Sequence, residues 1–181
     1  MEKFKKYIVP FVDDLVMGCG FIIPNYFITA GHIFDKYPSH TIFFNGKYYS
    51  FNKSDAIYLK STSEDTESEN IQDVAIFPFD DDSSPLNLYR LIPFVGSLIN
   101  NYSFLPITGQ RDPYAMIETE CIIKSVLFHF FECETSHVLN EGSSGSPLIY
   151  GNTVFGILSG CRNPETNPND VLFCSTKDFP I

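Results

Sequence analysis

Short apolar runs recur along the whole chain, and polar turn residues separate them. Examples are GCGFIIP at residues 18–24, DVAIFPF at 73–79 and NTVFGILSG at 152–160. These runs are rich in Phe, Tyr, Val and Ile, which favour strands, and long helical periodicity is nearly absent. The pattern predicts an all-β sandwich or barrel fold with short strands and tight turns.

Two segments interrupt this pattern. Residues 61–70, STSEDTESEN, are polar and acidic and hold no apolar anchor, which predicts a surface loop. Residues 80–93 combine an acidic run with two prolines and lie near the middle of the chain. This second segment is the best candidate for a linker, and it divides the chain into an N-terminal half, residues 1–85, and a C-terminal half, residues 86–181.

The composition indicates a globular chain that does not bind nucleic acid. Apolar residues make up 44% of the 181 residues and charged residues 19%, whereas disordered chains are poorer in apolar residues. The net charge of −10 would repel nucleic acid and anionic membranes. No stretch approaches the roughly 18 apolar residues that a membrane span requires, so we expect no membrane partner.

The cysteines and the N-terminal residues favour a cytoplasmic location. The chain has five cysteines, an odd number with no CxxC pair, whereas a secreted disulfide framework usually has an even number. We therefore expect reduced thiols. Pro10, Asp13 and Asp14 interrupt the first apolar run, so it does not form the core of a signal peptide. The four histidines are scattered without metal-ligand spacing, which predicts no metal and no cofactor.

Three local patterns together suggest nucleophilic catalysis. His32 ends TAGH after an apolar run, Asp73 opens DVAIF, and Ser144 lies between two glycines in GSSGSP. A serine, a histidine base and an acid that orients the imidazole form the set used for acyl transfer, and the order His, Asp, Ser is one of its known orders. Asp55 also precedes an apolar run and is the competing candidate for the acid.

The glycines around Ser144 have a physical purpose in this interpretation. The tetrahedral intermediate of acyl transfer carries an oxyanion, which is stabilised by backbone N–H groups that converge on one point. We expect the N–H groups of Gly142 and Ser144 to form this oxyanion hole. Such a turn requires backbone conformations that glycine adopts at low cost, and Gly145 would leave space beside the nucleophile.

TAGH, DVAIF and GSSGSP, followed by VFGILSG, resemble the chymotrypsin/trypsin-fold serine peptidases, and most closely the compact bacterial branch that includes glutamyl endopeptidases and HtrA-type protease domains. The resemblance spans residues 19–176. It implies two packed six-stranded antiparallel β-barrels with the active-site cleft between them. His32 and Asp73 would lie in the first barrel, and Ser144 in the second.

The resemblance also implies the role of each residue. Ser144 would be the nucleophile, His32 the general base and then general acid, and Asp73 the group that holds the imidazole tautomer. Ser159 in GILSG matches a family serine that lies beside the catalytic Asp. Residues 158–161, which include Leu158, Ser159 and Gly160, would offer a strand edge to which a peptide substrate pairs.

This chain departs from the family at two informative positions. Many members have an Asp directly before the nucleophile, which pairs with a new N-terminal amine after propeptide cleavage, and this chain has Ser143 there. We therefore expect no activation of that kind, and either a constitutive site or one that a regulatory partner switches. Ile33 replaces the Cys that follows the histidine in the animal enzymes, which fits a chain without disulfides.

The resemblance places the pocket for the P1 side chain, but the sequence leaves its preference open. One wall would include Val138, Leu139, Asn140 and Glu141, the second wall residues 157–161, and a third contribution would come from NDVLF at residues 169–173. Val138 favours an apolar or small P1 side chain. Asp170 would attract Lys or Arg if it faced the pocket floor.

The sequence thus predicts a serine endopeptidase that acts on a protein or peptide substrate, with narrow specificity or with gating by a partner. One alternative is a catalytically silent binding module with the same fold. Others are an esterase that uses the same residues and a β-barrel binding protein with coincident motifs. A bacterial defence or regulatory system and a viral polyprotein-type protease both fit the sequence.

Overall fold

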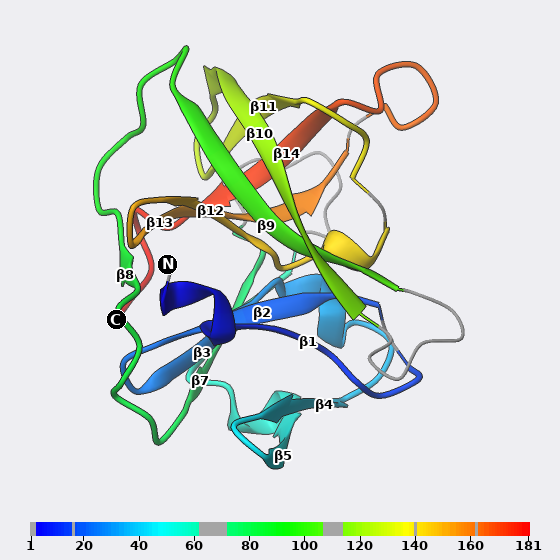
Figure 1. Ribbon diagram of the computed structural model, residues 1–181, viewed down its shortest axis with the longest axis vertical. Helices are drawn as coiled ribbons and strands as arrows, with labels where there is room; N and C mark the ends of the chain where they lie inside the picture. The colour runs from blue at the N-terminus through cyan, green and yellow to red at the C-terminus, as the bar shows by residue number, and fades with distance from the viewer. Residues whose placement is uncertain (1–2, 16, 62–71, 107–113, 140, 162) are drawn as a thin grey trace.

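The computed structural model describes residues 3–181 except 16, 62–71, 107–113, 140 and 162. The described part is all-β, as predicted, with short 3-10 helices and no α-helix. The acidic segment 61–70 lies outside the described residues, apart from Ser61. Figure 1 shows two strand systems packed on each other, the N-terminal one below and the C-terminal one above.

The N-terminal system consists of an antiparallel sheet in the order β1-β2-β3-β7-β6 and a β4-β5 hairpin. Its strands are β1 (Ile8–Pro10), β2 (Cys19–Ile23), β3 (Tyr26–Thr29), β4 (Ser39–Phe44), β5 (Lys47–Asn52), β6 (Tyr58–Lys60) and β7 (Val74–Pro78). A bridge between Phe11 and Ile42 joins β1 to the hairpin, and the short helix η3 (Lys53–Asp55) connects β5 to β6. The chain therefore wraps around a common interior, although strand pairing is interrupted at η3.

The C-terminal system is a closed barrel, because β12 pairs with both β9 and β13. Its strands are β9 (Leu98–Pro106), β10 (Tyr114–Val126), β11 (Phe130–Thr135), β12 (Pro147–Tyr150), β13 (Thr153–Gly160) and β14 (Asp170–Ser175). A two-residue strand, β8 (Asn87–Leu88), lies parallel to β13 at its outer side. The long strands β9 and β10 form the hairpin that rises through the view of Figure 1.

The two systems share one buried core. The largest cluster of buried apolar side chains contains Phe27 and Val74 from the N-terminal system together with Phe130 and Val154 from the C-terminal one. At the N-terminus, Phe4 in the helix η1 (Lys3–Tyr7) packs edge-on against Tyr102 of β9, with ring centroids 5.0 Å apart. Burial of apolar surface across the junction holds the two halves in a fixed relation, which the site between them requires.

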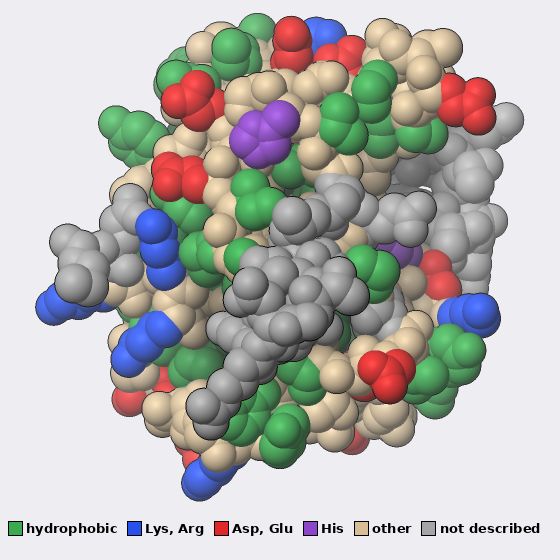
Figure 2. Space-filling view, turned by 45° about the vertical axis from the view of Figure 1, so that its right-hand side comes forward, with side chains coloured by type: hydrophobic (Ala, Val, Ile, Leu, Met, Phe, Trp, Pro, Cys, Tyr) green, Lys and Arg blue, Asp and Glu red, His purple; other side chains and the backbone are tan. Residues whose placement is uncertain are grey.

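The surface and the thiols agree with a globular protein. All five cysteines are free, and four of them are buried. On the face drawn in Figure 2, acidic side chains are dispersed among hydrophobic and uncharged ones rather than gathered in one patch. Within the described ranges, no helix has the length and apolar character needed to cross a membrane.

Candidate active site

His32 is placed by a tight turn at the end of β3. The helix η2 (Gly31–Phe34) begins two residues after that strand, and its Ile33 and Phe34 side chains are buried and anchor it. A Cβ atom on Gly31 would overlap the backbone carbonyl of Lys60. Glycine in the TAGH motif therefore lets β6 approach closely and fixes the backbone from which the imidazole projects.

The Asp73 carboxylate binds both the backbone and the imidazole of His32. It is fully buried, and it accepts hydrogen bonds from the His32 backbone N–H at 2.8 Å, the His32 Nδ1–H at 2.7 Å and the Ser159 hydroxyl at 2.5 Å. A buried carboxylate requires such donors because it has lost its hydration. The competing acid, Asp55, is exposed in η3 and is not among the hydrogen-bond partners of His32.

Ser144 completes the arrangement, with its Oγ 3.1 Å from Nε2 of His32. The turn after it is fixed by Gly145, which has a φ of +85° and whose Cβ, if present, would overlap the carbonyl of Cys19. The Cys19 N–H donates to the Ser144 carbonyl at 2.9 Å. These contacts cross from β2 to the C-terminal barrel, so they bring the serine to the histidine 112 residues away in the chain.

The surroundings of His32 set its protonation. Burial lowers the pKa of the imidazole, but the hydrogen bond and the charge of Asp73, together with the charge of Asp35, outweigh it and hold the pKa above its usual value. With Nδ1–H donated to Asp73, the neutral ring presents the Nε2 lone pair to the Ser144 hydroxyl. This is the arrangement that a general base requires.

The backbone directly before Ser144 forms a short helical turn. Residues Glu141–Ser143 form the 3-10 helix η5, so Gly142 lies inside a helical turn. In a 3-10 helix each N–H bonds to the carbonyl three residues earlier, so a turn that continued past Ser143 would engage the Ser144 N–H with the carbonyl of Glu141. The oxyanion hole expected at the N–H groups of Gly142 and Ser144 stays a prediction.

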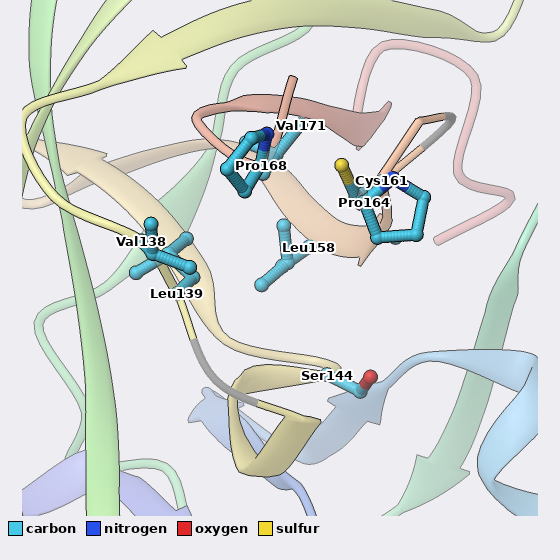
Figure 3. A pocket seen from close by; sticks show the side chains of 9 residues that line it. Val138, Leu139, Ser144, Leu158, Cys161, Pro164, Pro168 and Val171 are labelled. Atoms are coloured by element: carbon cyan, nitrogen blue, oxygen red, sulfur yellow. The ribbon is translucent and has the colours of Figure 1, made fainter. Parts of the chain in front are cut away.

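A pocket of about 340 Å³ opens beside Ser144. Figure 3 shows Leu158 in its middle, Val171 and Pro168 at the end far from Ser144, and Cys161 and Pro164 on the side opposite Val138 and Leu139. The residues that line it are Val138, Leu139, Ser144, Leu158, Gly160, Cys161, Pro164, Pro168 and Val171. Of the predicted pocket residues, Asn140 and the side chain of Glu141 lie outside the described part of the chain.

The structure places Asp170 outside this pocket. Its carboxylate pairs with Lys124 at 3.0 Å, and this contact raises the pKa of the Lys124 ammonium. Because side chains alternate along a strand, the pairing of Glu134 with Asp170 and of Cys133 with Val171 turns Val171 inward. The condition under which Asp170 would attract Lys or Arg is therefore not met, because Val171 and not Asp170 lines the pocket.

Sequence reasoning also missed Pro164 and Pro168, which line the pocket from the loop before β14. Their spacing within RNPETNPND indicated a turn, but not which way the loop folds. The same reasoning missed Asp35, whose charge acts on His32. Among the described residues, no three His, Cys, Asp or Glu side chains are grouped as metal ligands would be.

No protein-family model and no curated protein matches the chain, whereas solved structures resemble it over nearly its whole length. The Rv3671c protease of M. tuberculosis in an inactive form is 16% identical, with 96% of this chain and 85% of that one covered and a TM-score of 0.67. The scabies mite inactivated protease paralogue S-I1 is 16% identical, with 98% and 92% covered and a TM-score of 0.70. The mouse serine protease neuropsin is 15% identical, with 96% and 90% covered and a TM-score of 0.67.

These similarities confirm that the chain has the chymotrypsin-like serine peptidase fold. They include an inactive form and an inactivated paralogue, so the shared fold by itself does not decide between a working and a silent site.

Proposed function

We propose that this protein is a serine endopeptidase that hydrolyses peptide bonds through an acyl-enzyme. The observation that carries the proposal is the chain of hydrogen bonds from buried Asp73 through His32 to Ser144, at 2.7 and 3.1 Å. A binding protein has no need of a serine hydroxyl held on a neutral imidazole that a buried carboxylate orients.

The proposed reaction follows from these contacts. Ser144 Oγ attacks the substrate carbonyl carbon while its proton passes to Nε2 of His32, and the imidazolium is stabilised by Asp73. When the tetrahedral intermediate collapses, the C–N bond breaks and His32 gives this proton to the leaving amine. Water then attacks the acyl carbon while His32 takes its proton. The bond from the acyl carbon to Ser144 Oγ breaks, and His32 returns the proton to Oγ, which releases the carboxylic acid and regenerates the serine.

The second candidate, a catalytically silent binding module or a protease that a partner must switch on, is favoured by η5. A 3-10 turn that continued past Ser143 would bond the Ser144 N–H to the carbonyl of Glu141, and loss of one oxyanion donor lowers the kcat of an acyl-transfer site by about 10²–10³. In a gated peptidase, binding of the substrate or of a regulatory protein would rearrange Glu141–Ser143 and supply these donors.

Labelling with a small alkyl fluorophosphonate, read by intact mass, tests the proposal. We expect one adduct on the native chain and none on Ser144→Ala or His32→Ala, with a fall in peptide hydrolysis of about 10⁶-fold for Ser144→Ala. Circular dichroism checks that both variants fold. A folded native chain that forms no adduct would contradict the endopeptidase proposal and favour the binding module.

A further inference from the structure

The described lining of the pocket beside Ser144 is mostly apolar and uncharged. Seven of the nine residues that line it contribute Val, Leu, Pro or Cys side chains, and none of the nine carries a charge. A buried charge that no opposite charge compensates is strongly disfavoured. A substrate Lys, Arg, Asp or Glu would therefore lose its hydration in this pocket without gaining an ionic partner from the residues that the structure describes.

Asp170, the acidic residue of NDVLF, is held outside the pocket. Asp170 begins β14 next to Val171, and its carboxylate is paired with Lys124 on the outer face of the barrel. Its backbone carbonyl accepts a hydrogen bond from the Cys161 thiol at 3.0 Å. That thiol thus ties the end of the pocket loop to β13, while the charged part of Asp170 points away.

The size of the pocket selects among apolar side chains. Its volume of about 340 Å³ lies at the lower end of the roughly 300–1,000 Å³ that ligand pockets span. The methyl side chain of Ala would leave most of this space unfilled. Each methylene that a substrate lacks in an apolar pocket lowers its kcat/KM about 10-fold or more. Leu, Met or Phe fills the pocket better than Ala.

We propose that the pocket formed by Val138, Leu158, Cys161, Pro168 and Val171 makes this protein select a large apolar residue, Leu, Met or Phe, on the acyl side of the cleaved bond. This inference rests on the proposed endopeptidase function and names its substrate class. Gly160 also lines the pocket, and a Cβ atom on it would meet no atom within 4 Å, so a larger side chain can be placed at this wall.

The first experiment uses peptidyl diphenyl phosphonates that differ only at the residue bound in the pocket: Ala, Leu, Phe, Lys or Glu. We expect Leu and Phe probes to label Ser144 at least about 10-fold faster than Ala, and Lys and Glu probes to react more slowly than Ala. Fastest labelling by the Lys, Glu or Ala probe would overturn the inference while leaving the serine hydrolase proposal intact.

Two variants test whether the pocket causes the preference for the Leu and Phe probes. Gly160→Val places a branched side chain into open space at the pocket wall, so it is expected to fold and to lose much more of its reaction with the Leu and Phe probes than with the Ala probe. Asp170→Asn removes the carboxylate that lies outside the pocket and should leave the order of the probes unchanged. A large gain for Lys in the native chain that Asp170→Asn abolishes would place that carboxylate in the pocket and contradict the inference.

A second readout works even if Ser144 proves unreactive. Cys161 is the one free cysteine that is not buried and it lines the pocket, so occupancy can be followed as slower alkylation of this thiol by iodoacetamide, located by peptide mass mapping. Acetylated tetrapeptides that end in Leu or Phe should protect Cys161, and those that end in Lys or Glu should not. Equal protection by all four, or none by any, would overturn the apolar preference independently of catalysis.

Discussion

On one side of Ser144, Asp73 is fully buried and accepts three hydrogen bonds, from the backbone and the ring of His32 and from Ser159. On the other side, the backbone of Glu141–Ser143 forms the short 3-10 helix η5 directly before the nucleophile. The acid–base side of the site is thus held by side-chain hydrogen bonds to a buried carboxylate, whereas the oxyanion side is a short turn of backbone.

This difference has a physical origin. A buried carboxylate must be satisfied by fixed donors in every folded molecule, since an unpaired one would be strongly destabilising. Backbone N–H groups before the nucleophile can instead be satisfied locally by a helical turn until an oxyanion or a carbonyl oxygen competes for them. One side of the site is therefore determined by folding, whereas the other can be left to substrate or partner binding.

Among the changes on the acid–base side, Asp73→Asn is expected to cause the largest loss of activity. An amide side chain cannot hold the Nδ1–H tautomer as a carboxylate does, so we expect kcat to fall by about 10⁴-fold with KM little changed. Peptide hydrolysis by the purified variant measures this. Asp55→Asn, which changes the exposed competing acid, serves as the matched control and should retain activity. A loss smaller than tenfold for Asp73→Asn would mean that Asp73 does not orient the base.

Two glycine substitutions compare the stability that the turn after Ser144 contributes with that of an unconstrained turn. Gly145→Ala combines a φ of +85° with overlap against the Cys19 carbonyl, and we expect it to lower the free energy of unfolding by about 3 kcal/mol or more. Gly151→Ala shares a positive φ of 64° but meets no atom within 4 Å, so it should cost about 1–2 kcal/mol. Urea denaturation compares the two. Equal losses in the free energy of unfolding would show that the Cys19 carbonyl in β2 moves aside at little cost.

A milder change on the acid–base side is Ser159→Ala. It removes one charge-assisted hydrogen bond to Asp73, and such bonds contribute about 1.5–3 kcal/mol, so kcat should fall by about tenfold to a hundredfold while KM stays nearly constant. Ser159→Thr keeps the hydroxyl and should restore most of the loss. If both variants behave alike, the effect comes from packing beside β13 and not from the hydrogen bond.

The smallest predicted effect is a shift of the pH profile of kcat/KM when the charge of Asp35 is removed. Because only neutral His32 can accept the proton of Ser144, kcat/KM should decline as the pH falls through the raised pKa of this imidazole. Asp35→Asn removes one of the charges that raise this pKa, so the acidic limb of the profile should move to lower pH. Asp55→Asn provides the control, with the limb expected to stay in place. An unmoved limb in Asp35→Asn would show that solvent screens this charge.

Much of the site could be predicted from the sequence because the backbone beside it requires glycine at particular positions. TAGH needs a glycine where Lys60 approaches, and GSSGSP needs one at the positive φ of Gly145. Both requirements are tied to single positions: the positive φ of Gly145 is local, whereas Gly31 is required by the close approach of β6. The assignment of His32, Asp73 and Ser144 to one place followed from their motifs, and the structure brings all three side chains together.

The sequence by itself therefore determined the all-β class and the three residues that the fold assembles, because residue type and chain order are enough to specify them. Only the tertiary structure decided that Val171, and not Asp170, faces the pocket, because a shift of one residue in strand register reverses which side chain points inward. It also decided how the C-terminal barrel closes, with β12 paired to both β9 and β13. That closure depends on which distant strands lie side by side, and local sequence does not specify it.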